Sequence, residues 1–374
     1  MAGTHYYVDN LNGTDSVGFG TSPGSGAVAT IGYLLAHLSD DPVGTQINLA
    51  DNAAHTLSGS LDYTTFGAPT INGNITWRGY TSTANDGGVA TIDGASTYSL
   101  TGSSSVVSYV NFVDLIIQNL AHSSGWSAPF GYATILNVRW INCTGVVGGG
   151  NAPQFINCSF EDFPVYAGIP YALHFTGVGL VSGCFFRNNT RSCINLNGAA
   201  VTARDNILAV NNGYNGIVLS GAVGGVSIVN NSLLGVSHST GDAIQLINTS
   251  YQCDICNNLI EGFTGGYVVN QGVSTRTRDN GILANNSYYN CSSSFNYTSE
   301  VICYEGNESL GSTPFAKSGS ITFANRETYF APQDVGSVFG GSLHSNRDRG
   351  AVQGAGSGSG GGFPTRLIGG GGMN

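Results

Sequence analysis

Four segments of one repeat read ARDNIL (203–208), IVNNSLL (228–234), DICNNLI (254–260) and LANNSYY (283–289). Each places a pair of polar turn residues between short apolar runs, and successive copies lie about 25 residues apart. Weaker copies precede them as INCTG (141–145), INCSF (156–160) and VSGCFF (181–186). A second marker keeps the same spacing as YALHF (171–175), SCINL (192–196), NGIVL (215–219), DAIQL (242–246) and GYVVN (266–270). Two markers in step predict a repeating unit with at least two strands and two turns.

A unit of this length cannot bury its apolar side alone, so it must stack on its neighbours. Strands of one coil then pair in parallel with those of the next, about 4.8 Å away. Equivalent turn residues stack as well, and their side chains are expected to bond to one another and to the turn backbone. The two predicted ladders are Asp205, Asn230, Asn257 and Asn285, and beside them Asn206, Asn231, Asn258 and Asn286. The sequence therefore predicts an all-β solenoid of parallel strands.

The solenoid needs closed ends, because each end is an edge that could pair with another chain. Residues 1–45 are expected to form a strand, a loop and a helix over 29–41, whose apolar side covers the first coil. The coils occupy 46–305, and a C-terminal cap is predicted over 306–353, where the repeat is lost. Residues 354–374 are Gly-rich and are expected to be an assembly tail that packs on a partner subunit.

Two repeat strands supply a test of the register. Val229 and Ile255 both lie in strands whose apolar residues are assigned to the core. An aspartate at either position is expected to unfold the rod, because a buried and unpaired carboxylate costs several kcal/mol.

The composition of the chain excludes some classes of function. Only 9% of the 374 residues are charged, and the net charge is −10. Nothing in such a chain would neutralise phosphates, so nucleic acid is not an expected partner. No apolar run is long enough to insert into a membrane as a helix, and the start of the chain lacks the pattern of a secretory signal. We therefore expect synthesis in a cytoplasm, with the eight cysteines reduced and mostly buried. Cys253 and Cys256 should face opposite sides of a strand and so cannot jointly hold a metal.

With the repeat in place, the chain resembles the right-handed parallel β-helix superfamily, the pectate-lyase-like fold. Three frame segments add to the resemblance: YYVDNLNGTDSVGFGTS (6–22), TIGYLLAHL (30–38) and DRGAVQ (348–353). The resemblance spans residues 5–353 and implies a right-handed helix of coils. That superfamily includes polysaccharide lyases, polygalacturonase-like hydrolases, and tailspikes and other virion proteins of bacteriophages, and fold alone does not choose among them.

Catalysis is the alternative hypothesis. The lyases of the superfamily use a Lys or Arg base and Ca²⁺ held by several Asp residues, but Lys317 is the only lysine here and lies outside the repeat. No metal site and no cofactor are predicted. Glycoside hydrolysis needs two carboxyl groups about 5 to 9.5 Å apart. If the chain is a hydrolase acting on polysaccharide, the candidate residues are Asp242, Asp254, Glu261 and Asp279.

The favoured hypothesis is structural. Few charges, a stacked rod and a Gly-rich tail are typical of a fibre, spike or capsid-surface protein on a phage-like virion. Such a protein is expected to be a homotrimer, to contact other virion proteins and to contact host-surface glycan. Outward aromatic side chains could stack on sugar rings, and the candidates for binding are Tyr214, Tyr251, Tyr267 and Trp126.

Overall fold

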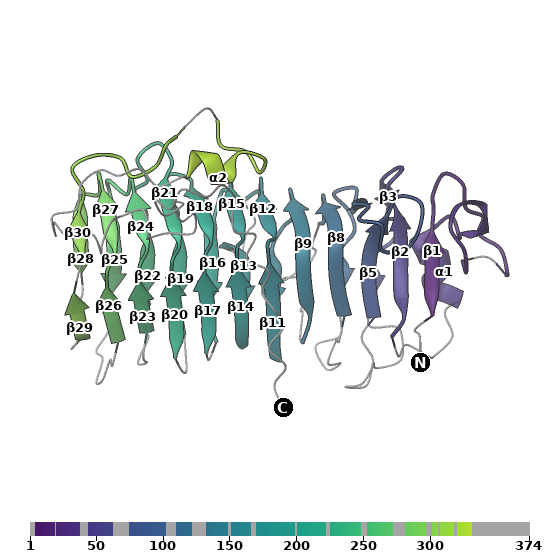
Figure 1. The fold of residues 1–374 in the computed structure, drawn as a ribbon, viewed down its shortest axis with the longest axis horizontal. Coiled ribbons are helices and arrows are strands. Elements are labelled where there is room, and N and C mark those ends of the chain that lie inside the picture. Colours follow the sequence, from purple (N-terminus) through teal and green to yellow (C-terminus); the bar gives the residue numbers. More distant parts are fainter. Residues whose placement is uncertain are drawn as a thin grey trace, which may run out of the picture.

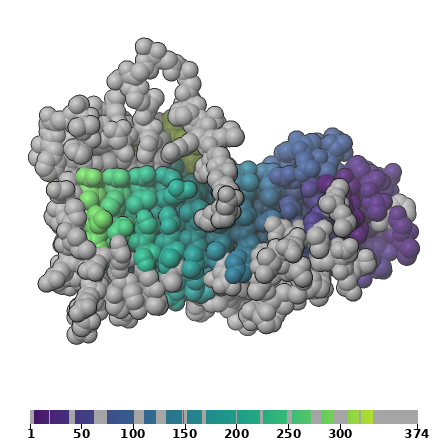
Figure 2. All heavy atoms as spheres, turned by 60° about the horizontal axis from the view of Figure 1, so that its bottom comes forward, coloured from purple at the N-terminus to yellow at the C-terminus, as the bar shows by residue number. Residues whose placement is uncertain are grey.

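The computed structural model describes residues 4–18, 20–37, 44–62, 75–101, 110–121, 132–148, 151–165, 170–198, 200–221, 225–247, 253–271, 281–296, 301–305, 307–317 and 320–330. These residues form an elongated rod of stacked parallel strands (Figure 1). The space-filling view shows the same order, with the chain running from purple to green along the long axis (Figure 2). The predicted parallel solenoid is confirmed, whereas its right-handedness stays a prediction.

From residue 146 onward each coil has three strands, one on each of three faces. Face 1 is a seven-stranded parallel sheet of β10 (Val146–Gly148), β13 (Tyr171–Phe175), β16 (Ser192–Leu196), β19 (Ile217–Leu219), β22 (Ile244–Leu246), β25 (Tyr267–Gln271) and β28 (Ser293–Asn296). Face 2 holds β11 (Asn151–Ile156), β14 (Val178–Ser182), β17 (Val201–Arg204), β20 (Val226–Val229), β23 (Cys253–Cys256), β26 (Gly281–Ala284) and β29 (Val301–Glu305). Face 3 holds β12 (Ser159–Glu161), β15 (Phe185–Arg187), β18 (Ile207–Val210), β21 (Ser232–Gly235), β24 (Leu259–Glu261), β27 (Ser287–Tyr289) and β30 (Glu308–Ser309).

The first coils are less regular. Their strands are β1 (His5–Val8), β2 (Gln46–Ala50), β3 (His55–Thr56), β4 (Leu61–Asp62), β5 (Ile75–Tyr80), β6 (Ala90–Asp93), β7 (Leu100–Thr101), β8 (Val110–Gln118) and β9 (Thr134–Ile141). A 3-10 turn, η1 (Gly24–Gly26), and the helix α1 (Ile31–His37) lie between β1 and β2. The helix begins at Ile31 rather than at residue 29, residues 38–41 of the predicted span lie outside the described residues, and the helix lies beside β1 at one end of the rod (Figure 1). Its Ile31 and Leu34 are buried in the core. No described helix is long and apolar enough to cross a membrane.

The predicted ladder that starts at Asn206 is confirmed. Asn206, Asn231, Asn258 and Asn286 are fully buried, and each Nδ2 donates to the Oδ1 of the next, at 2.9, 3.0 and 2.9 Å. Each of these Oδ1 atoms also accepts a backbone N–H from the coil before it. Asn307, which the sequence analysis did not include, continues the ladder at 2.8 Å. The ladder satisfies backbone groups that the turns would otherwise leave unpaired.

The residues of the neighbouring row shape the turn mainly through their backbone conformation. Asp205, Asn230, Asn257 and Asn285 all have φ between 55° and 58°, the left-handed conformation that Asn and Asp tolerate best. One side-chain contact in this row was found between Asn230 Nδ2 and Asp205 Oδ1, at 3.4 Å. These residues therefore turn the chain between faces 2 and 3, and the amide bonding predicted for both rows is strong only in the Asn206 row.

One core assignment is wrong and one is right. In β20 the buried residues are Val226 and Ile228, whereas Val229 is half-exposed on the outer side. Ile255 in β23 is buried as predicted. Val229 is apolar but directly precedes the turn residue Asn230, and alternation along the strand places it outside. The same alternation buries Cys253 and leaves Cys256 half-exposed, as their spacing predicts.

The chain reverses its course after the last described strand. β30 pairs with β27, and the residues that follow run back along face 3 towards α2 (Arg326–Tyr329), which lies near β15 and β18 (Figure 1). We call residues 310–317 and 320–330 the C-terminal arm. A second core cluster joins the arm to the outward side of face 3, through Leu310, Phe315 and Phe330 of the arm and Phe185, Ile207, Ala209, Leu234 and Leu259 of the coils.

The described part of the predicted C-terminal cap, 306–353, lies along the side of the rod, where its apolar residues cover an apolar strip of face 3, and the cap itself stays a prediction. Residues 331–353 and the predicted assembly tail, 354–374, lie outside the described residues.

Candidate functional site

The three described candidate carboxylates belong to one coil. Asp242 lies two residues before β22, Asp254 lies in β23 and Glu261 ends β24. They therefore belong to three different sides of the rod, and Asp242 and Glu261 are buried whereas Asp254 is partly exposed. The fourth candidate, Asp279, lies outside the described residues. A glycosidase needs two carboxyl groups flanking the same bond, and no two of these three share a hydrogen-bond network among the described residues.

Asp242 ties three coils together. Its Oδ1 accepts the backbone N–H of Tyr267 at 2.8 Å, and its Oδ2 accepts from Asn270 Nδ2 at 2.7 Å. In the other direction, the backbone N–H of Asp242 donates to Asn215 Oδ1 at 2.7 Å. The side chain is buried, with both carboxylate oxygens occupied by neighbours in the next coil. These contacts indicate a structural carboxylate that also orients the polar groups around it.

A polar strip runs along the outer side of face 1. In paired positions on successive strands lie His174, Asn195, Val218, Gln245 and Asn270, and we call the four polar members the polar strip. Asn195 Nδ2 and His174 Nδ1 are 2.8 Å apart. Burial lowers the pKa of His174 to about 4, so its ring is neutral at pH 7. The sequence analysis missed this strip, although a polar side chain stands at the fourth position of three copies of the second marker, YALHF, SCINL and DAIQL.

Tyrosines flank the polar strip at the corner between faces 3 and 1. Tyr267 begins β25 next to Asp242 and is half-buried. Tyr214 lies two coils away, before β19, and packs partly against the core. Tyr171 begins β13, with its ring stacked on His174 at 5.9 Å between centroids. The structure thus brings Tyr214 and Tyr267 to one corner. The other two predicted binding residues, Tyr251 and Trp126, lie outside the described residues.

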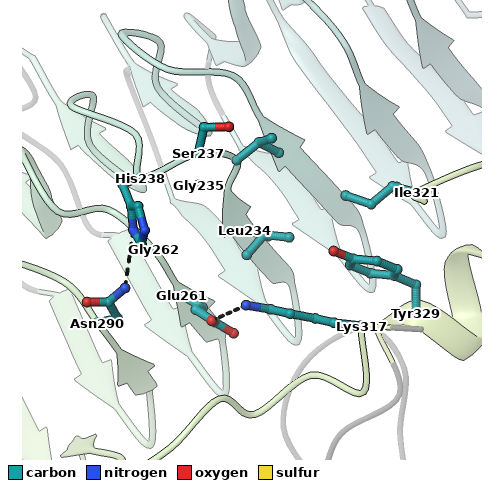
Figure 3. Close-up of a pocket in the computed structure, with 11 residues that line it drawn as sticks. Leu234, Gly235, Ser237, His238, Glu261, Gly262, Asn290, Lys317, Ile321 and Tyr329 are labelled. Carbon is teal, nitrogen blue, oxygen red and sulfur yellow. Dashed lines mark hydrogen bonds and ion pairs between the residues drawn. The ribbon is translucent and has the colours of Figure 1, made fainter. Parts of the chain in front are cut away.

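A pocket of about 200 Å³ opens between face 3 and the C-terminal arm (Figure 3). Its lining comes from β21 and the turn after it, from the end of β24, from Asn290 and from the arm: Leu234, Gly235, Val236, Ser237, His238, Glu261, Gly262, Asn290, Lys317, Ile321 and Tyr329. Gly235 and Gly262 stack in consecutive coils, and a Cβ at Gly262 would lie only 2.6 Å from the Gly235 carbonyl oxygen. Glycine is required there because Gly262 also has φ +83°.

Glu261 is held from the arm. Its buried carboxylate forms an ion pair with Lys317 through Oε1 and accepts from Thr313 Oγ1 at 2.8 Å through Oε2. On the opposite side of the pocket, Asn290 Nδ2 lies 3.3 Å from His238 Nδ1, and both residues are exposed (Figure 3). Glu261 therefore sits in the pocket as one half of an ion pair with Lys317.

A second buried glutamate supports the arm further along face 3. Glu161 accepts from Arg139 Nη2 at 3.0 Å, from Arg187 Nε at 2.8 Å and from Ser159 Oγ at 2.7 Å. Burial raises the pKa of Glu161, but the hydrogen bonds from Ser159 and Arg187 and the charge of Arg139 outweigh it and leave the pKa lowered. The group was not a sequence candidate, although the three charged residues occupy neighbouring positions in successive coils.

The arm lies directly on this group. The Phe323 ring has Arg139 Cζ at 4.8 Å and Arg326 Cζ at 4.1 Å, and Arg187 Nη1 donates to the Ile321 carbonyl oxygen at 3.4 Å. Cation–π contacts of this kind contribute about 0.5–2 kcal/mol each. The arm is therefore fastened by aromatic, ionic and backbone contacts at once.

Comparison with known proteins identifies a solved structure with a similar fold. No protein-family model and no curated protein matches the chain. Among solved structures, pectate lyase Pel9A is similar with a TM-score of 0.62 and 14% identity, covering 94% of this chain and 97% of that one. A GH136 lacto-N-biosidase from Eubacterium ramulus (13% identity, 82% of this chain, 67% of that one) and a GH87 alpha-1,3-glucanase (11%, 81% and 69%) reach TM-scores of only 0.39 and 0.29. The chain therefore has the pectate-lyase-like parallel β-helix fold.

Proposed function

We propose that this protein is a glycan-contacting parallel β-helix that serves as an external structural component of a phage-like particle and does not cleave its ligand. The observation that carries the proposal is the polar strip on face 1 with its flanking tyrosines. The fold supports it, because pectate lyase Pel9A uses the same architecture. That likeness is one of fold, so the glycan contact is argued from the side chains.

The end of the polar strip formed by Gln245 and Asn270 suits a short stretch of oligosaccharide, because these two residues are partly exposed whereas His174, Asn195 and the intervening Val218 are buried. Parallel strands place the side chains of Gln245 and Asn270 about 4.8 Å apart. Gln245 Oε1 accepts from Asn215 Nδ2 at 2.9 Å, and its own amide N–H groups can donate to sugar hydroxyls. Tyr171 and Tyr267 add aromatic surface at the edge, on which the apolar side of a sugar ring can pack.

Contact without cleavage follows from how the carboxylates are used. Asp242 binds the next coil, and Glu261 is paired with Lys317. Neither has a second carboxylate beside it among the described residues, so a general acid and its base or nucleophile are not both in place. The low charge and the rod shape support the particle setting, and the homotrimer is what the resemblance to spikes and fibres of this fold implies.

Loss of binding in strip variants tests the proposal. We expect Gln245→Ala and Tyr267→Ala each to weaken binding of a recognised surface oligosaccharide at least about tenfold, measured by isothermal titration calorimetry after a glycan-array screen. Gln245 lies on the outer side of β22, between the buried Ile244 and Leu246, and Tyr267 is the partly exposed first residue of β25.

The matched control is Ser227→Ala, an outward residue of face 2 in the coil next to Gln245. Its affinity should equal that of the unaltered protein. The proposal fails if no glycan on the array binds, or if the face 2 control loses as much affinity as the strip variants.

A further inference from the structure

The pocket beneath the C-terminal arm is separate from the polar strip. It opens on face 3, and its two sides come from coils and from residues far along the chain: Glu261 and Lys317 are 56 positions apart. The pocket exists only because the arm folds back, since Lys317, Ile321 and Tyr329 form one of its walls (Figure 3).

The polar groups of the pocket lie on two sides of it. Lys317 provides ammonium hydrogens beyond the one directed at Glu261, and the Glu261 carboxylate has lone pairs beyond those used by Lys317 and Thr313. His238 and Asn290 stand exposed at the opposite side. The pocket therefore offers both donors and acceptors, as the hydroxyl groups of a polyol require.

The remaining surface of the pocket is apolar. Leu234, Val236 and Ile321 contribute aliphatic groups, and Tyr329 lies with its hydroxyl end directed towards Leu234 (Figure 3). Because Glu261 and Lys317 neutralise each other, the pocket carries no excess charge that would select an ion. Its volume of about 200 Å³ is below the roughly 300–1,000 Å³ that encloses a drug-sized molecule, so it holds one small ring.

We propose that this pocket is a second saccharide site that binds a single neutral sugar ring, with its hydroxyls on Glu261, Lys317 and the His238–Asn290 pair and its apolar side on Leu234 and Tyr329. The inference rests on the proposed function in taking the ligand to be a saccharide. It goes further by naming a separate site, a ring of no net charge and the residues that hold it.

Lys317 makes occupancy of the pocket measurable, because it is the only lysine of the chain. The probes are glucose, galactose, mannose, rhamnose and N-acetylglucosamine, added singly to the full chain. We expect at least one to slow acetylation of Lys317 about fivefold or more, read by peptide mass spectrometry. The α-amino group of Met1 serves as the internal standard and should react at an unchanged rate.

Two variants assign the binding to the pocket. His238→Ala and Asn290→Ala alter exposed residues and leave the Glu261–Lys317 pair in place, so the arm stays attached. Each should weaken the binding of the protecting sugar about tenfold, by saturation-transfer NMR titration, whereas Gln245→Ala should not change it. The inference is overturned if no sugar protects Lys317, or if the protection persists in both pocket variants.

The two proposals fail in distinguishable ways. If oligosaccharide binding depends on Gln245 but no monosaccharide protects Lys317, the proposed saccharide site in the pocket is wrong and the proposed function stands. If protection of Lys317 depends on His238 but no glycan binds in a way that depends on Gln245, the saccharide site in the pocket stands and glycan binding by the polar strip is wrong.

Discussion

Replacing Ile228 with aspartate should unfold the rod, whereas the same replacement at the neighbouring Val229 should leave it folded. Ile228 is fully buried between Ala203 and Ile255 of the adjacent coils, and Val229 is half-exposed on the outer side of β20. A buried, unpaired carboxylate costs several kcal/mol, which is a large part of the roughly 5–15 kcal/mol that stabilises a typical domain. The midpoints of urea unfolding, followed by circular dichroism, measure the difference.

The pair of variants is its own control, because the two residues are adjacent and receive the same side chain. Val229→Asp should lower the free energy of unfolding by about 1 kcal/mol or less, as surface substitutions usually do. Equal losses of stability at both positions would show that the strand register of face 2 is not the one described here.

Glu161→Gln should be the second most damaging single change. It leaves Arg139 and Arg187 without their shared carboxylate, and because these two arginines are 33% and 23% exposed, the expected cost is about 1–3 kcal/mol rather than that of a fully buried charge. Because Phe323 of the arm packs on Arg139, the loss should also loosen the arm. The free energy of unfolding and the hydrogen exchange of residues 320–330 are the two measurements.

Glu327→Gln is the matched control, since Glu327 pairs with Arg326 while remaining 67% exposed. Exposed pairs contribute about 0–1 kcal/mol, so this variant should match the unaltered protein. A stability loss for Glu161→Gln no larger than for Glu327→Gln would contradict the role given to the buried group.

The lowered pKa of Glu161 predicts that the stability of the fold depends on pH. The folded-state pKa of this glutamate is lowered, so the carboxylate stabilises the fold above its unfolded value near 4.5, and that contribution is lost as pH falls through the folded pKa. The stability difference between the unaltered protein and Glu161→Gln should therefore be full at pH 7 and shrink in acid below pH about 4.5. A difference that grows on acidification would reverse the sign of the argument.

The fold was predictable because its signal recurs. Asn206, Asn231, Asn258 and Asn286 come at nearly constant spacing, and stacking places residues of constant spacing together. The side of the strand that Val229 occupies was not predictable from β20 alone. That strand carries apolar residues at Val226, Ile228 and Val229, so a period of two does not single out the buried ones.

The candidate sites were less accessible from sequence. The candidate carboxylates Asp242, Asp254 and Glu261 belong to three different sides of one coil, and the sequence alone does not show where the coil turns from one side to the next. The pairing of Glu261 with Lys317 depends on where the arm folds, and no local pattern encodes a contact over 56 positions. The polar strip could have been found by aligning the copies of the second marker and comparing their outward positions.

Incubation with polysaccharide is the most direct test of contact without cleavage. The protein is mixed with a panel of bacterial surface polysaccharides and with polygalacturonate, and each mixture is analysed for bound protein and for the size of the polysaccharide chain. The account predicts that at least one polysaccharide binds and that its size distribution stays unchanged. Shortened chains that disappear with Asp242→Asn or Glu261→Gln would contradict it and establish a polysaccharide-degrading enzyme instead.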